Sequence, residues 1–300
     1  MAEITENPLV NLSEALAERA SLARPLVAGI AVPGRRMRSG TLWRKDVVVA
    51  SEQRFPDASD GQVTLADGSA LTARVAGRDP GTNVVALQLN GTPDPAPLPP
   101  REPRPGGFAL AFGADDGGIA VRLGVIHSVG PSWHSRAGGR IDRRITLDIG
   151  LTPREEGGPV LDPGGGLLGI STLGPRGRVL VIPASTVEAV LDPLLSKGRV
   201  ERGWLGLALQ PVLVPEALQA EAGQSQGLMV MGVSKDGPAT RANLHAGDIL
   251  VKIAGKSVTS PSAVAQYLGP DSVGKQVELH LIRADKLLSI AVTVGIRPSR

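Results

Sequence analysis

Between two apolar segments, 145–151 and 167–170, the chain reads Thr152-Pro153-Arg154-Glu155-Glu156-Gly157-Gly158-Pro159-Val160. The two adjacent glycines allow positive φ and close approach of the backbone. The prolines fix φ and remove backbone donors, so this run predicts a tight turn. Because the flanking segments are short and apolar, we expect the turn to connect two strands.

The composition predicts a globular protein with many short strands. The chain has 300 residues, which suggests two domains, and 42% of them are hydrophobic, enough to form buried cores. Its 38 glycines and 25 prolines favour turns over long helices. Basic and acidic residues are interspersed and the formal net charge is +3, which does not indicate a nucleic-acid partner. The absence of cysteine excludes disulfides, thiol catalysis and thiolate metal sites.

The first twenty residues predict neither an export signal nor a membrane anchor. They are rich in glutamate, lack a basic start and contain no continuous apolar core. Nowhere does an apolar run reach the length of about 18 residues that a membrane-spanning helix needs. These features predict a cytoplasmic protein without a membrane partner.

An amphipathic helix is expected over residues 8–22, as a separate N-terminal element within residues 1–24. Leu9, Leu12 and Leu16 recur at helical spacing, and Asn11 with Glu14 fits a capping box. The helix either packs on its own domain or contacts another copy of the chain.

Short strands separated by turn signals follow, which favours an antiparallel barrel or sandwich. Asp67-Gly68 predicts a type I′ turn between two of these strands. The strands expected in this first set are 26–32, 40–43, 47–50, 62–65, 70–75 and 84–89.

A proline-rich segment divides this set from a second one. Residues 92–105 contain seven prolines and cannot form a helix or a central strand, so we expect a crossover between two half-barrels. A helix over 185–195 and a charged linker over 196–202 close the second set. Its expected strands are 108–112, 120–129, 144–148, 160–161, 167–172 and 179–182.

Four further segments carry a resemblance to a known family. Residues 40–52 look like the family's strand pair that ends in the histidine motif Thr-Asn-Ala-His, and residues 79–87 look like its Asp-Pro-x-Thr-Asp-Leu-Ala-Val-Leu. Residues 124–129 and Ile182-Pro183 match a later strand and the entry into the last helix. Together with the turn described above, they show that residues 25–195 resemble trypsin-fold serine proteases of the HtrA/Deg type. The resemblance implies a mainly β fold, with a trypsin-like double antiparallel β-barrel.

The resemblance also implies that the catalytic residues are replaced. The family's loop reads Asn-Pro-Gly-Asn-Ser-Gly-Gly-Pro, which places Glu156 at the serine and Arg154 at the glycine of the oxyanion hole. By the same comparison, Glu52 stands for the histidine and Asn83 for the aspartate. We therefore expect a degenerate triad and no catalytic residue.

A serine protease needs a hydroxyl, a base that takes its proton and a group that orients the base. Glu156 has no hydroxyl, and Arg154 enters a positive-φ turn less easily than glycine does. The four histidines all lie outside the matching motif and are expected to be structural or surface residues: His127, His134, His245 and His280.

In the parent geometry, Glu52 and Glu156 would bring two carboxylates into one cleft. Like charges at that separation do not both ionise without help. They would share a proton, be neutralised by Arg154 or another arginine, diverge, or bind a divalent cation together with the Asn83 carbonyl. We favour neutralisation or divergence, with no metal and no cofactor.

Residues 203–298 resemble a PDZ domain. Trp204-Leu205-Gly206-Leu207 fits the carboxylate-binding loop, residues 237–250 fit the family's central signature, and residues 262–268 fit the helix beside the peptide groove. The resemblance implies binding of protein or peptide C-termini by strand addition. The expected peptide-binding residues are Trp204, Leu205, Gly206, Leu207, Val264 and Leu268, unless the apolar ones only fill a small core.

The leading interpretation is a non-catalytic protease homologue that acts as a peptide-binding or assembly protein. A second interpretation is a hydrolase of another class that uses Glu52 and Glu156 as its acid–base pair. A third is a structural subunit of a cytoplasmic enzyme complex. The resemblance also implies a homo-oligomer.

Overall fold

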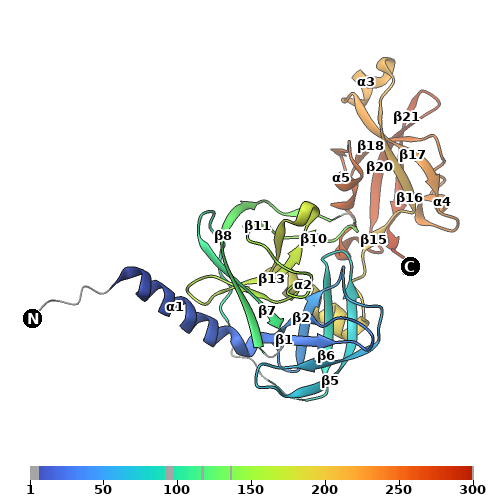
Figure 1. Ribbon diagram of the computed structural model, residues 1–300. Coiled ribbons are helices and arrows are strands. Elements are labelled where there is room, and N and C mark those ends of the chain that lie inside the picture. Colours follow the sequence, from blue (N-terminus) through green and yellow to red (C-terminus); the bar gives the residue numbers. More distant parts are fainter. Residues whose placement is uncertain (1–6, 92, 94–97, 116–117, 136, 299–300) are drawn as a thin grey trace, which may run out of the picture. The chain divides into compact units, whose positions relative to one another are not determined.

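The structure is a computed structural model, and it describes the chain except for residues 1–6, 92, 94–97, 116–117, 136 and 299–300 (Figure 1). The chain divides into two compact units, Met1–Ala137 with Ile141–Val200 and Gly138–Arg140 with Glu201–Arg300. The predicted mainly β fold with two antiparallel barrels is confirmed. No helix of the described residues is long and apolar enough to cross a membrane.

The first barrel is closed in the strand order β1-β2-β3-β6-β5-β4. Its core is aliphatic, with Val48, Val63, Val85 and Leu87 completely buried. Each strand supplies these side chains at alternate positions, as expected for a small barrel. The strands are β1 (Val27–Ala31), β2 (Arg38–Arg44), β3 (Val47–Ser51), β4 (Asp60–Thr64), β5 (Ala70–Asp79) and β6 (Val84–Leu89).

The β4–β5 turn differs from the type I′ prediction. Gly68 has a positive φ of 86° whereas Asp67 does not, and Gly68 N donates to Leu65 O at 2.9 Å. A type I′ turn needs positive φ at both central residues, so this prediction is wrong. The Asp67 carboxylate instead accepts bonds from the amide and hydroxyl of Ser69, at 2.9 and 2.6 Å, which fixes the longer loop.

The second barrel closes in the order β11-β14-β13-β12-β7-β8. Helix α2 (Ala184–Lys197) packs Val187, Leu191 and Leu194 against the strands and ends at Gly198, which takes the left-handed conformation. The strands are β7 (Phe108–Asp115), β8 (Gly118–Gly130), β11 (Arg144–Asp148), β12 (Pro159–Leu161), β13 (Leu167–Leu173) and β14 (Val179–Pro183), with the short β9 (Trp133–His134) and β10 (Arg140–Ile141) between β8 and β11.

Helix α1 (Pro8–Ala23) packs on the barrels over its second half only. Leu16 and Ala20 contact the cluster around Phe112, whereas Leu9 is 74% exposed and the helix projects from the barrels (Figure 1). The predicted capping box is wrong, because Asn7 is the N-cap and its side chain accepts from Leu9 N at 3.0 Å.

The second unit is built on one sheet in the order β16-β17-β18-β20-β21, so β16 is an edge strand. Helix α5 lies beside β16 and is shorter than predicted, since it ends at Ala265 before Leu268. The elements are β15 (Gly203–Trp204), β16 (Leu207–Leu213), α3 (Glu216–Ala222), β17 (Gln226–Val233), α4 (Pro238–Arg241), β18 (Ile249–Ile253), β19 (Lys256–Ser257), α5 (Pro261–Ala265), β20 (Gln276–Arg283), β21 (Lys286–Thr293) and β22 (Gly295–Ile296).

Candidate functional site

The turn at 152–158 threads between the two barrels, and its glycines are required there. A Cβ on Gly158 would lie 1.9 Å from the carbonyl oxygen of Phe112 in β7. A Cβ on Gly157, where φ is +99°, would lie 2.5 Å from Ser39 O in β2. Only glycine fits such close backbone approach. The turn therefore holds the side chain of the preceding residue, Glu156, at the junction of the barrels.

Two neighbouring residues lock this turn. Arg154 O accepts bonds from the amide and hydroxyl of Ser39, at 2.9 and 2.7 Å. The Glu155 carboxylate accepts from Thr152 N at 2.7 Å and pairs with Arg122 at 2.9 Å. Arg154 does not take a positive φ, and its guanidinium lies 3.3 Å from Asp115. Arg154, one of the arginines predicted to neutralise Glu156, thus pairs with Asp115.

Glu156 itself is 3% exposed and bound by donors from both barrels. Its Oε2 lies 3.2 Å from Nε of Arg54, a contact that forms an ion pair without the alignment of a hydrogen bond. Neutralisation by an arginine, as predicted, thus comes from Arg54. Its Oε1 accepts bonds from Ser51 Oγ at 2.8 Å, Thr172 Oγ1 at 2.7 Å, Leu173 N at 3.1 Å and Gln53 Nε2.

Gln53, not Glu52, faces Glu156. Asn83 completes the group, because its Oδ1 accepts from Gln53 N at 2.7 Å and its Nδ2 donates to Thr172 Oγ1 at 2.8 Å. Asn83 has φ of +61°, which asparagine tolerates, and Asp79 caps the turn before it through Thr82 N at 3.1 Å. The expected contact between Glu52 and Glu156 is therefore not found, and the side chain beside Glu156 is that of Gln53.

Glu52 points away from this group. The chain turns after β3, with Phe55 N donating to Glu52 O at 2.9 Å, and the side chains of Ser51 and Gln53 bond Glu156. The charges that act on Glu52 are those of Arg78 and Asp79, and no hydrogen bond or ion pair among the described residues joins it to Glu156. The side chains of Glu52 and Glu156 thus diverge, which was the predicted alternative to two carboxylates facing each other. The described residues include no group of three His, Asp or Glu suited to a metal ion.

Burial raises the pKa of the half-buried Glu52 carboxyl, and the positive charge of Arg78 offsets only part of this rise. Its pKa in the folded chain is therefore above the unfolded value of about 4.3. Its contribution to stability is full below the unfolded value and is lost as pH rises through the folded value. We expect Glu52→Gln to raise Tm at pH 7 and to leave it unchanged near pH 4, measured by calorimetry. The exposed Glu18→Gln should show neither effect, and an equal rise at both pH values would contradict the assignment.

In the PDZ-like loop, the backbone carbonyls are hydrogen-bonded within the unit and two backbone amides are not. Gly206 has φ of +79°, and the carbonyls of Leu205 and Gly206 accept from Ala239 N at 2.9 Å and Ser234 N at 2.8 Å. For the amides of Leu205 and Gly206, the described residues offer no backbone acceptor. Those amides are the groups that an anion would need.

The side chains around this loop divide into two groups. Leu205 and Val264 are 2% and 4% exposed, so they fill the core. Trp204, Leu207 and Leu268 are only partly buried, and Leu207 lies in the edge strand β16. The sequence reasoning missed Leu209 and Tyr267, which pack on the same cluster; the alternation of β16 would have indicated Leu209.

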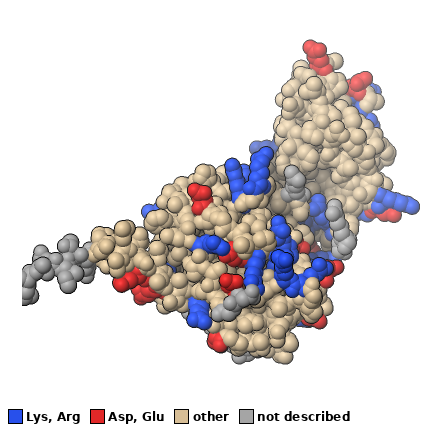
Figure 2. All heavy atoms as spheres, viewed as in Figure 1, with Lys and Arg blue, Asp and Glu red and all other residues tan. Residues whose placement is uncertain are grey.

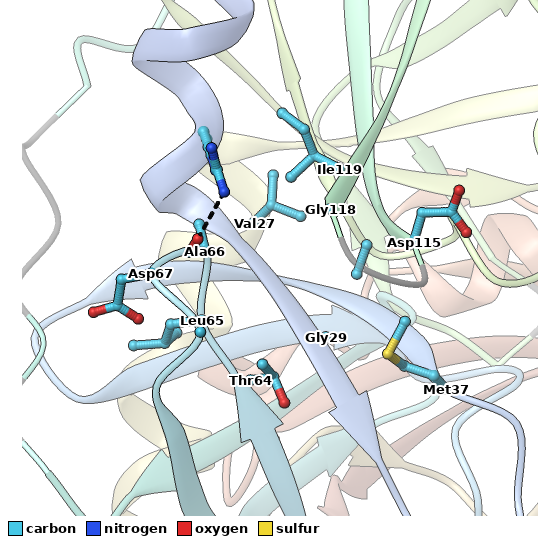
Figure 3. A pocket seen from close by; sticks show the side chains of 13 residues that line it. Val27, Gly29, Met37, Thr64, Leu65, Ala66, Asp67, Asp115, Gly118 and Ile119 are labelled. Carbon is cyan, nitrogen blue, oxygen red and sulfur yellow. Dashed lines mark hydrogen bonds between the residues drawn. The ribbon is translucent and has the colours of Figure 1, made fainter.

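A separate cavity of about 380 Å³ lies where α1 ends, between the first barrel and the β7–β8 hairpin. Val27, Met37 and Ile119 form its apolar lining, and Arg24 donates to Ala66 O at 3.2 Å on one side (Figure 3). None of the residues that bond Glu156 lines it. On the face drawn in Figure 2, basic and acidic side chains are interspersed.

Comparison with known families matches two parts of the chain. Residues 38–170 match the trypsin-like peptidase domain, and residues 203–294 match the PDZ domain. The sequence is 30% identical over 263 residues to a probable periplasmic serine endoprotease, DegP-like, of Brucella suis, covering 84% of this chain and 51% of that protein. It is 32% identical over 268 residues to the protein of that name in Chlamydia trachomatis serovar D, covering 84% and 52%. The chain thus spans about half the length of these relatives.

Solved structures of two proteases superpose on nearly the whole chain. The HtrA-type protease AlgW with a tripeptide superposes with a TM-score of 0.76 at 26% identity, over 95% of this chain and 98% of that one. The serine endoprotease from Yersinia pestis superposes with a TM-score of 0.76 at 24% identity, over 94% and 98%. The curated relatives are named periplasmic, which contradicts the predicted cytoplasmic location.

Proposed function

We propose that this chain, which belongs to the HtrA-type family of trypsin-fold proteases with a PDZ domain, does not cleave peptides and acts by binding the C-termini of other proteins. Periplasmic proteins are the proposed partners, in line with the names of the relatives. Self-association remains a prediction.

The observation that carries the first half of this proposal is the bonding of Glu156. The side chain at the nucleophile position is a carboxylate that four donors and an arginine already engage. Gln53 is an amide and cannot take a proton as a general base. The hydroxyls of Ser51 and Thr172 both donate to Glu156 and are buried, so neither is available to attack a peptide.

Proteolysis of unfolded casein tests this directly. We expect no turnover by the purified chain beyond that of a Glu156→Ala variant prepared in the same way. Activity that survives both Glu156→Ala and Gln53→Ala would come from a contaminant. Activity of the unchanged chain that either substitution removes would refute the non-catalytic proposal.

The second half of the proposal rests on the free edge of β16 and the amides of the adjoining loop. A sheet edge can accept an added peptide strand, and backbone amides in a loop can hold its terminal carboxylate. Solved structures of the HtrA-type protease AlgW include one with a tripeptide and one with a decapeptide. A hydrolase that pairs Glu52 with Glu156 has no comparable support, since the two side chains diverge.

Blocking the peptide carboxylate should remove most of the binding. Hydrogen bonds to a charged group contribute about 1.5–3 kcal/mol, so an amidated C-terminus should weaken binding by about 10- to 100-fold. The measurement is fluorescence anisotropy with octapeptides that end in an apolar residue, as free acid and as amide. Equal affinity of the two forms would rule out this use of the loop.

A further inference from the structure

Arginine side chains from four segments of the chain meet at the turn at 152–158. One donates to the carbonyl oxygen of Pro153 at 2.7 Å, and two pair with the carboxylates of Glu155 and Glu156 at 2.9 and 3.2 Å. The fourth belongs to the turn itself and lies 3.3 Å from Asp115. In chain order, the four are Arg38, Arg54, Arg122 and Arg154.

The charges of these pairs are layered, with the carboxylates of the turn below the surface. The side chains of Glu155 and Glu156 are 5% and 1% exposed, whereas those of their partners Arg122 and Arg54 are 47% and 49% exposed. Each pair therefore presents its positive partner to solvent. A molecule that approaches the turn meets the guanidinium groups first, and the buried carboxylates lie behind them.

Two loops that adjoin this turn add exposed arginines without a carboxylate partner. Residues 33–38 lead into β2, where Ser39 N donates to the turn at 2.9 Å. Residues 174–178 follow Leu173, whose amide donates to Glu156 at 3.1 Å. Together the two loops contain five arginines and no acidic residue. Four of these arginines are exposed and have no ion pair with a described residue: Arg35, Arg36, Arg176 and Arg178.

The eight arginines named above, which we call the arginine patch, carry more charge than the whole chain. Eight arginines less the three carboxylates that pair with them, Asp115, Glu155 and Glu156, give a formal charge of +5, whereas the chain has +3. The patch is therefore local, unlike the extended basic stripes of proteins that bind a nucleic-acid backbone. Guanidinium groups match carboxylates, which they bind through two hydrogen bonds at once.

We infer that the arginine patch binds an acid-rich segment of another protein, which lies across the turn at 152–158. The loops 33–38 and 174–178 adjoin the turn near Pro153 and near Glu156, so carboxylates at two points of such a segment meet unpaired guanidinium groups. Glu156 is buried and already paired, so it does not repel the segment. This binding uses the first compact unit alone and needs no free C-terminus, which makes it a surface in addition to the one proposed on the PDZ unit.

The test is fluorescence anisotropy with two decapeptides and the full chain in about 0.1 M salt, where exposed charges more than about 10 Å apart are largely screened. Both peptides carry a neutral label at the N-terminus and an amide at the C-terminus, so neither offers a terminal carboxylate to the PDZ-like loop. One contains six glutamates and the other six glutamines at the same positions. We expect only the glutamate peptide to bind.

Removal of the unpaired arginines should weaken this binding. Each exposed pair of an arginine with a carboxylate contributes a factor of about 1.4 to 5 in affinity. We therefore expect at least about tenfold weaker binding of the glutamate peptide when four such pairs are lost together. The variant carries Arg35→Gln, Arg36→Gln, Arg176→Gln and Arg178→Gln.

The matched control removes the same number of charges from exposed side chains of the second unit. Because these charges do not belong to the patch, the affinity should stay within about twofold of the unchanged chain. An equal loss in both variants, with both folded by circular dichroism, would overturn the inference. The control carries Lys235→Gln, Lys256→Gln, Lys275→Gln and Lys286→Gln.

The remaining outcomes concern the ligand. Equal binding of the glutamate and glutamine peptides, or no binding of either, would overturn the inference. Tighter binding of a single-stranded DNA of ten nucleotides than of the glutamate peptide would overturn the choice of a protein segment. None of these results bears on the binding of free C-termini, which the free-acid octapeptides test separately.

Discussion

A variant with Glu156→Ser, Gln53→His, Asn83→Asp and Arg154→Gly should cleave unfolded casein. These are the four positions at which we propose that the family's nucleophile, base, orienting group and oxyanion loop would stand. Gln53 Nε2 already bonds the side chain of Glu156, and Asn83 Oδ1 already accepts from Gln53 N at 2.7 Å. Histidine and aspartate placed there would stand within reach of a serine, as general-base catalysis requires.

The sharpest control moves the histidine by one position. A variant that carries Glu52→His in place of Gln53→His, with the other three changes kept, has the same composition of catalytic groups. Since Glu52 points to Arg78 rather than to Glu156, we expect the first variant to be at least about 100-fold faster, the usual worth of a positioned general base. Casein turnover and labelling of the introduced serine by a fluorophosphonate are the two measurements. Equal rates, with both variants folded by circular dichroism, would contradict the assignment of Gln53.

The replacement Arg283→Met should cost the PDZ unit about 3–5 kcal/mol of stability. Arg283 makes two bonds of 2.7 Å to Asp248, whose side chain is 2% exposed. Without the guanidinium, the carboxylate stays buried and retains only the amide of His245 as a donor, at 2.9 Å. Calorimetry of the full chain should show the transition of this unit at a much lower temperature. Arg241→Met is the matched control, since its side chain bonds only the carbonyl of Asp236 and should shift Tm little.

The same pair predicts a dependence on pH. Burial alone would raise the pKa of Asp248, but the hydrogen bonds from Arg283 and His245 N, with the charge of Arg283, hold it below its usual value. The pair therefore stabilises the fold above the unfolded pKa of about 3.9, and this contribution is lost as pH falls through the folded value. The difference in Tm between the unchanged chain and Arg283→Met should shrink below pH 4. A difference that stays constant down to pH 2 would exclude the ion pair as its source.

The strands and turns could be predicted because their signals are local, whereas the double barrel and the PDZ domain were predicted from resemblance to a family. Glycine pairs, proline runs and alternating apolar residues specify turns and strands wherever they stand. The errors arose where more than one side chain could make the same local hydrogen bonds. The helix is capped by Asn7 rather than by the predicted box of Asn11 and Glu14. The predicted type I′ turn is instead a longer loop in which Asp67 accepts from Ser69 N.

The site was predicted less completely, for two physical reasons. Glu52 was chosen by matching a motif, but β3 ends at Ser51 and the turn that follows brings the side chain of Gln53 to Glu156. Thr172 and Leu173 lie more than a hundred residues from Gln53, and only the docking of the two barrels brings them to Glu156. A sequence pattern within one segment cannot predict a hydrogen-bonded cluster whose members come from two different barrels.

The bonding around Glu156 also bears on how such a centre changes over evolutionary time. The side chains around Glu156 are hydrogen-bonded to one another, so a single reversion disturbs its neighbours. Glu156→Ser removes the acceptor of Thr172 Oγ1 and Leu173 N and leaves these buried groups unpaired. Asn83→Asp places a second carboxylate close to that of Glu156. Unpaired buried polar groups cost about 1–3 kcal/mol each, and residues in one network are not additive. Stepwise return to a protease therefore crosses less stable intermediates. The hydrogen bonds around Glu156 therefore make the reversions epistatic. The loss of folding stability in each single reversion opposes the recovery of proteolysis.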